Sequence, residues 1–288
     1  MPILLALASA VVYGVADWCG GRATRSRPAV QVALLGQGVS SVLIVVAVAV
    51  MGTPFPPAAD LWWGALGGGL GAAGLGTFYY ALANGEMTVV APITAVVSAV
   101  LPVGVGLATG ERPKAIAYVG IAVAVAAVAL VSGAVGEHHH TTPRRILVLA
   151  GVAGLGFGSL FVAVDRTSEA SGLWPLVGAR LTSVPLLALV VAIARIGVHD
   201  ARLRRTRGGP RASGLPVAAG VLDMAANVLF LAATRGGLLS IVAVVGSLYP
   251  ASTVVLAATF DHERIRRAQG VGMVCAACAL VLVSLGRA

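Results

Sequence analysis

Runs of about twenty apolar residues recur from one end of this sequence to the other, separated by short segments that hold most of the charges. An α-helix rises about 1.5 Å per residue, so about 20 apolar residues cross the roughly 30 Å hydrocarbon core of a bilayer. We therefore predict an all-α polytopic membrane protein with about ten transmembrane helices. The predicted spans are residues 3–20, 29–51, 61–83, 87–109, 115–135, 145–164, 173–194, 214–234, 238–260 and 268–286.

The composition excludes the soluble classes of protein. Charged residues make up 11% of the chain and apolar residues 58%, whereas an ordinary soluble domain is about 25% charged. The formal net charge of +9 arises in short loops, without a Lys/Arg patch interleaved with aromatic residues, so we expect no nucleic-acid partner. The expected surroundings are the lipid bilayer of the cell membrane, which the chain crosses many times.

Two halves of the sequence match each other at a nearly constant offset. At an offset of 152, Glu111-Arg112 falls on Glu263-Arg264, and at an offset of 144, Tyr13-Gly14 falls on Phe157-Gly158. We therefore predict one five-helix repeat at 1–136, a linker at 137–143 and a second repeat at 144–288. Because each repeat has an odd number of spans, equivalent helices cross the membrane in opposite directions, which makes an inverted repeat typical of transporters.

These motifs, in this order and with this duplication, resemble the EamA type of the drug/metabolite transporter superfamily over nearly the whole chain. The resemblance implies a carrier that moves small metabolites, often exporting amino acids or amphipathic compounds, through a central cavity lined by both halves. The sequence departs from the family pattern at His262, where Gly is usual, and at Gln37, where a basic residue is usual. The residues that carry the resemblance are Tyr13-Gly14, Ala91-Pro92-Ile93, Gly110-Glu111-Arg112-Pro113, Arg180, Ser247-Leu248-Tyr249-Pro250 and Glu263-Arg264.

Ionisable residues inside the predicted spans are the main candidates for function, because each costs several kcal/mol in lipid unless it is paired or faces water. Asp223 lies near the middle of its span with Asn227 one turn further on, and Arg180 lies at a similar depth in the preceding antiparallel span. Arg180 can therefore meet Asp223 or Asn227. Two interpretations stay open, a salt bridge that only locks two helices and a site for substrate or protons.

Other polar and aromatic residues are weaker candidates for the cavity. Gln37 occupies the position equivalent to Arg180 and can hydrogen-bond across helices. Asp17 lies near the end of the first span beside a Trp, where an interfacial acid is equally ordinary. Tyr249 could line the cavity, whereas Tyr80 fits a cavity or an interfacial belt equally well.

Proline and glycine residues mark places where the helices bend or pack closely. Pro92, Pro102, Pro185 and Pro250 each remove a helical hydrogen bond, so we expect kinks there, near a binding site or hinge. The third span repeats small residues at four-residue spacing, which favours close helix packing.

The sequence gives no reason to expect a cofactor, a metal or an enzyme. No Gly-rich phosphate loop follows a strand, and Glu137-His138-His139-His140 lacks the fixed second half of a metal site. Neither His199 nor His262 has a nucleophile at a recognisable spacing.

We therefore expect a secondary transporter that binds a small-molecule substrate between the repeats and alternates access by rocking them, driven by protons or by the substrate gradient. The alternative is a non-transporting structural membrane subunit. A single-chain duplication needs no partner, so a monomer is expected. Fourteen basic residues lie in loops on the side opposite the termini and five on the terminal side, which predicts external termini, whereas the family resemblance implies cytoplasmic ones.

Overall fold

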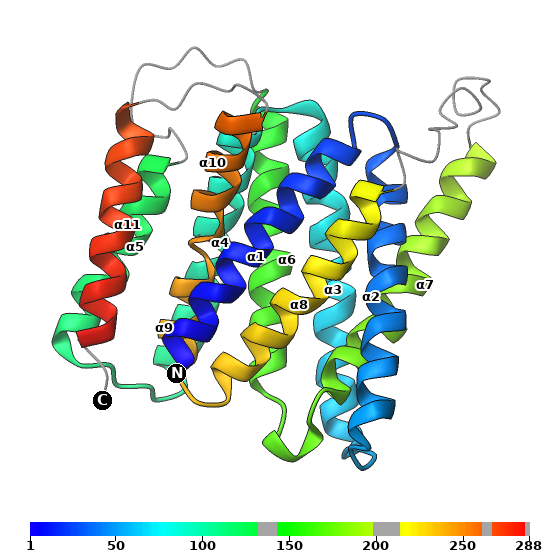
Figure 1. Cartoon of the computed structure of the whole chain (residues 1–288), viewed down its shortest axis with the longest axis horizontal. Helices are drawn as coiled ribbons and strands as arrows, with labels where there is room; N and C mark the ends of the chain where they lie inside the picture. The colour runs from blue at the N-terminus through cyan, green and yellow to red at the C-terminus, as the bar shows by residue number, and fades with distance from the viewer. Residues whose placement is uncertain (132–142, 198–213, 261–266, 286–288) are drawn as a thin grey trace.

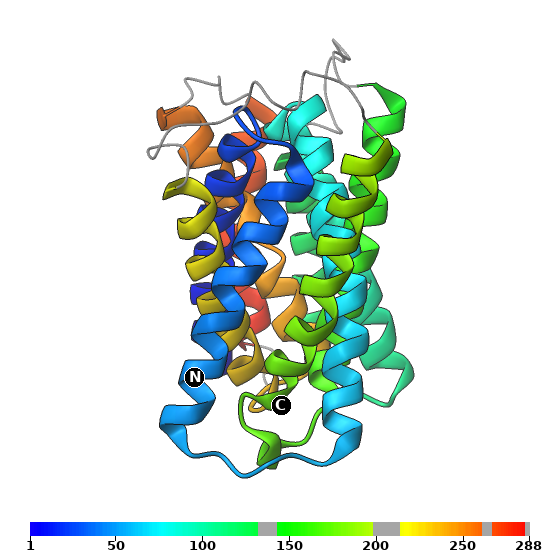
Figure 2. The same ribbon diagram turned by 90° about the vertical axis from the view of Figure 1, so that its right-hand side faces the viewer.

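The computed structural model describes residues 1–131, 143–197, 214–260 and 267–285, and the regular structure in these ranges is entirely helical. The helices stand side by side in a bundle that is about as tall as a single span and more than one helix deep, which we call the helix layer (Figures 1 and 2). The first repeat contains α1 (Pro2–Ala23), α2 (Ala29–Met51), α3 (Ala58–Asn84), α4 (Met87–Ala108) and α5 (Ala115–Val131). The second contains α6 (Arg144–Asp165), the short helix η1 (Glu169–Ser171), α7 (Trp174–Gly197), α8 (Gly214–Thr234), α9 (Leu239–Gly246), α10 (Tyr249–Phe260) and α11 (Arg267–Leu285).

The membrane-crossing character of these helices follows from their length and composition. Seven segments among the described residues are long and apolar enough to span a bilayer, and α9 with α10 counts as one of them. The helices α3, α5 and α11 run alongside these seven in the same layer (Figure 1). The chain is therefore a polytopic helical membrane protein with about ten crossings, as predicted.

The ninth span differs from the prediction, because it is two helices rather than one. A continuous span over 238–260 was expected, but α9 ends at Gly246 and α10 begins at Tyr249. Pro250 has no N–H to offer the carbonyl of Gly246, and Ser247 and Leu248 turn the chain instead, with the Leu248 N–H donating to the carbonyl of Val245 at 3.2 Å. Hydropathy could not reveal this break, because both pieces are apolar. In contrast, α4 continues through Pro92 and Pro102, and α7 continues through Pro185.

The two repeats interleave around a pseudo-two-fold axis in the membrane plane. Helix α1 packs against α8, and the equivalent pair, α6 and α3, packs in the same way. The equivalent helices α5 and α11 pack on each other at one edge of the molecule, and α2 contacts α7. The layer is therefore built from contacts between the inverted repeats more than within them.

Glycines on α3 let this helix approach its neighbours closely, as the spacing of small residues predicted. A Cβ atom on Gly68 would clash with the backbone of Ala179 on α7, and one on Gly64 would clash with the backbone of Pro175. By contrast, Gly69 faces open space. The contact between α3 and α7 thus depends on the absence of a side chain at Gly64 and Gly68.

Polar contacts join the two repeats at the end of the layer where α1 begins and α11 ends, which we call the terminal end (Figure 1). The Asp60 carboxylate at the start of α3 accepts hydrogen bonds from the backbone N–H and the hydroxyl of Ser168, at 3.1 and 2.5 Å. The Glu111 carboxylate accepts from the N–H groups of Leu239 and Ser240, at 2.6 and 3.0 Å, and so caps the start of α9. Both contacts bridge the repeats.

The sequence motif around Glu111 acquires a structural explanation from this cap. Gly110 has a φ of 101°, a left-handed conformation that suits glycine, and the turn it makes brings Glu111 to the start of α9. Its repeat partner Glu263, together with Asp261, His262 and Arg264, lies outside the described residues, as do Glu137-His140 and His199.

Candidate functional site

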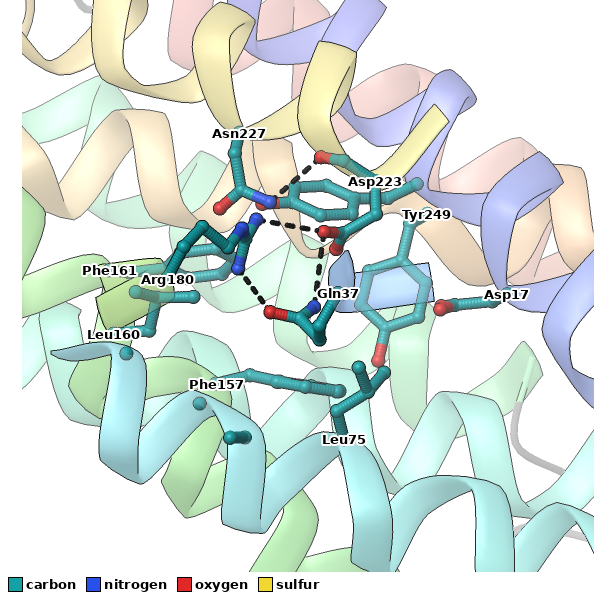
Figure 3. Close-up of a pocket in the computed structure, with 14 residues that line it drawn as sticks. Asp17, Gln37, Leu75, Phe157, Leu160, Phe161, Arg180, Asp223, Asn227 and Tyr249 are labelled. Carbon is teal, nitrogen blue, oxygen red and sulfur yellow. Dashed lines mark hydrogen bonds and ion pairs between the residues drawn. The ribbon is translucent and has the colours of Figure 1, made fainter. Parts of the chain in front are cut away.

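A cavity lies inside the helix layer and is lined by both repeats (Figure 3). The cavity volume is about 40 Å³, well below the roughly 300–1,000 Å³ of pockets that hold drug-sized ligands. Helices α1, α2 and α3 of the first repeat and α6, α7, α8 and α10 of the second contribute lining residues. The lining residues are Tyr13, Asp17, Gln37, Gly68, Gly71, Ala72, Leu75, Phe157, Leu160, Phe161, Arg180, Asp223, Asn227 and Tyr249.

A buried ion pair sits at the centre of the polar side of this cavity. Nη2 of Arg180 lies 3.0 Å from Oδ2 of Asp223, and the two side chains are 7% and 21% exposed. The pairing expected from their depths in adjacent spans is therefore present. Because a buried carboxylate or guanidinium alone would be costly, each charge holds the other in place.

The first repeat completes this network through α2. Gln37 accepts a hydrogen bond from Nη1 of Arg180 and another from the Ser183 hydroxyl at 2.9 Å, while its own amide nitrogen donates to Asp223 at 3.4 Å. Asn227 donates to the backbone carbonyl of Asp223 at 2.8 Å. The neutral Gln37 thus bridges the two charges from the opposite repeat (Figure 3).

Close packing of α2 on α8 sets up this geometry. A Cβ atom on Gly220 would clash with the backbone of Gly36, so the two backbones approach each other where both side chains are absent. The Ser40 hydroxyl fastens the contact by donating to the carbonyl of Gly220 at 2.6 Å. Gln37 and Asp223 follow these glycines by one and three residues, which puts them face to face.

The break in the ninth span places Tyr249 in the cavity wall. Tyr249 is the first residue of α10, and its hydroxyl donates to the carbonyl of Ala91 on α4 at 3.3 Å. That carbonyl precedes Pro92. The proline-containing segments of both repeats therefore meet beside the cavity, although α4 itself is not interrupted.

The remaining candidates fall in different places. Asp17 is buried and lines the cavity rather than lying at an interface. Tyr80 does not line the cavity; its side chain is 43% exposed in a separate groove between α3 and α7. The adjacent Tyr79 is buried at 4% exposure, also outside the cavity.

Three aromatic residues of the cavity wall were not among the candidates. They are Tyr13 on α1 and Phe157 and Phe161 on α6. The ring centroids of Tyr13 and Phe161 lie 6.2 Å apart, and Phe161 stacks on Phe230 at 4.1 Å. A signal was available, since Tyr13 and Phe157 are partners in the internal repeat.

Comparison with known proteins agrees with this architecture. The family model described as "EamA-like transporter family" matches residues 1–133 and 144–285, which is two copies over nearly the whole chain. The chain belongs to this family. It is therefore a multi-pass membrane transporter of the drug/metabolite transporter superfamily, as the motifs implied.

Solved structures show the same fold, with 26 chains matching. One of them, described as "Crystal structure of protein", covers 99% of this chain and 96% of its own, with a TM-score of 0.74 and 16% identity. At that identity the similarity concerns the fold. No curated protein matches the chain.

Proposed function

We propose that this protein is a secondary transporter of the cell membrane that carries a small metabolite through the cavity by alternating access, as an exporter. The observation that supports the proposal most directly is the Arg180–Asp223 pair, held by Gln37 from the opposite repeat. A rocking motion of one repeat against the other must change the contacts of Gln37 with Arg180 and Asp223, because these join α2 of the first repeat to α7 and α8 of the second.

The pair also has suitable chemistry for a transport cycle. Asp223 can exchange its contact with Arg180 for a proton or a substrate cation. A proton gradient or the gradient of the substrate itself would supply the energy.

The size of the cavity indicates a state close to occluded. A volume of about 40 Å³ is too small for a whole metabolite. The contacts of Asp60 and Glu111 join the repeats at the terminal end, so opening at that end must break them. We therefore expect opening at the opposite end to need fewer changes in the described contacts.

The test is substrate-driven proton movement in proteoliposomes that hold purified protein and a trapped pH dye. The panel contains amino acids, amines and amphipathic cations, and wild type is compared with Asp223→Asn, which keeps the shape but removes the charge. Glu169→Gln is the control, since Glu169 is exposed on η1, outside the cavity. We expect flux of one compound class to fall at least tenfold in Asp223→Asn and to persist in the control.

The outcomes separate transport from a purely structural role. Unchanged flux in folded Asp223→Asn would show that the ion pair only holds α7 and α8 together and takes no part in transport. If wild type moves no proton, radiolabelled uptake of the same panel distinguishes uncoupled transport from a non-transporting membrane subunit.

A further inference from the structure

A second carboxylate in the cavity lies outside the network around Arg180. Asp17 on α1 is 7% exposed and lines the cavity, yet within the described part of the chain its side chain has no hydrogen bond and no ion pair. In Figure 3 it lies beyond Tyr249, away from the dashed contacts that join Asp223, Gln37 and Arg180. A carboxylate buried in this way needs a proton or a positive partner.

The cavity does not supply that partner from its own described side chains. Arg180 is the one cation among the lining residues, and its two terminal nitrogens already contact Asp223 and Gln37. When both carboxylates are ionised, the lining carries one negative charge more than it can neutralise. A positively charged ligand would balance it.

A second unsatisfied group lies next to Asp17 on the same helix face. The hydroxyl of Tyr13 is buried and has no hydrogen-bond partner in the described structure, although it lines the same cavity. Residues four apart on a helix lie one above the other, so Tyr13 and Asp17 present an oxygen each to the same space. The Asp17 carboxylate only accepts hydrogen bonds when ionised, and the Tyr13 hydroxyl can accept as well as donate, so a ligand that brings N–H groups satisfies both.

Aromatic rings form the walls around these two oxygens. Tyr249 lies beside Asp17, and Phe157 and Phe161 line the cavity from α6 (Figure 3). Aromatic faces attract organic cations, and they bury the hydrocarbon part of an amphipathic ligand at the same time. A carboxylate with aromatic walls is suited to an amine that carries an apolar group.

We propose that Asp17 and Tyr13 form a subsite for the ammonium group of a small organic amine. This subsite rests on the transport function proposed above and names its substrate class. The ammonium N–H groups donate to the Asp17 carboxylate and to the Tyr13 oxygen. Because Asp223 already neutralises Arg180, a substrate carboxylate finds no free cation, so the site prefers simple amines to zwitterionic amino acids.

The test compares three compounds of similar shape and different charge. These are 2-phenylethylamine, phenylalanine and 3-phenylpropanoate, measured as equilibrium binding to the full chain in detergent by competition with radiolabelled 2-phenylethylamine. We expect wild type to bind the amine at least tenfold tighter than either competitor. Asp17→Asn should weaken amine binding at least tenfold, and Tyr13→Phe about threefold or more.

The controls separate the subsite from general damage. Glu169→Gln also neutralises a carboxylate, at an exposed position near the terminal end and outside the cavity, and should leave amine binding within twofold of wild type. Asp17→Glu keeps the charge and should keep the preference for the amine. If Asp17→Asn does not fold, the subsite is tested by amine binding to Tyr13→Phe and by the order in which wild type binds the three compounds.

Two results would overturn the subsite. One is wild type that binds phenylalanine or 3-phenylpropanoate as tightly as the amine, or binds no amine at all. The other is folded Asp17→Asn with unchanged amine binding. Binding does not require flux, so proteoliposomes that show neither proton movement nor radiolabelled uptake, with intact amine binding, would refute transport alone. Flux with no effect of Asp17→Asn on amine binding would refute the subsite alone.

Discussion

Glu111 offers a sharp test of how the inverted repeats are joined. Its carboxylate receives two backbone N–H groups at the start of α9, across the boundary between the repeats. Hydrogen bonds to a charged group contribute about 1.5–3 kcal/mol each, and a negative charge at a helix N-terminus adds about 0.3–1 kcal/mol. Glu111→Gln keeps one acceptor oxygen and loses the charge, so we expect a loss of roughly 2 kcal/mol in stability.

The loss should be visible in thermal unfolding. A change of about 2 kcal/mol corresponds to a fall of about 4–8 °C in Tm at the scale known for soluble domains of about 150–250 residues. The four tryptophans provide a fluorescence signal on heating the purified protein in detergent. Glu111→Ala, which removes both acceptors, should melt lower still.

The matched control is Glu169→Gln, an identical chemical change at an exposed position near the same end of the layer. Surface substitutions of this kind usually change stability by less than about 0.5 kcal/mol. If Glu111→Gln melts within one degree of Glu169→Gln, the carboxylate does not hold α9, and the explanation given for this motif is wrong.

Three further changes test the packing. Gly68→Ala should lower Tm, because the new Cβ would meet the Ala179 backbone and overpacking costs about 1–3 kcal/mol. Gly69→Ala, at the next residue, faces open space and should be neutral or stabilising. Equal Tm values for the two variants would contradict the close contact between α3 and α7. Gly110→Ala should cost about 1–2 kcal/mol by strain at positive φ, measured by the same melt, and an unchanged Tm would show that the turn tolerates a side chain. Asp60→Ala leaves the Ser168 N–H without its acceptor and should cost about 1–3 kcal/mol; wild-type melting and unchanged amide exchange at Ser168 would exclude this role.

Much of the fold could be predicted because lipid imposes a length on each apolar run. The short loops and the internal repeat then determined that the helices alternate in direction and that the repeats are inverted. The pairing of Arg180 with Asp223 followed from the same reasoning, since both lie at similar depths in adjacent antiparallel spans. Depth along a helix is readable from sequence when the end of the span is clear.

Rotation about the helix axis was much harder to predict. Helix α3 is rich in glycine and apolar all round, so nothing in its pattern decided whether Tyr79 or Tyr80 turned inward, and the structure buries Tyr79. For Asp17 the choice between cavity and interface stayed open, because the predicted span ended at residue 20, whereas α1 continues to Ala23 and carries this residue deeper into the layer. Tyr249 was predicted in the cavity wall, but Phe161 was missed because a ring in a lipid-spanning helix looks the same whether it faces lipid or a ligand.

The interleaving of the repeats has a consequence for how the chain is made. Helix α1 packs mainly against α8, and α3 packs mainly against α6 and α7. Helices α6, α7 and α8 are synthesised after α1 and α3. Until residues 214–234 have entered the bilayer, α1 must wait beside lipid or the insertion machinery. Synthesis order and packing order therefore disagree, and a chain stopped at the linker would be a set of inserted helices rather than half of a finished protein.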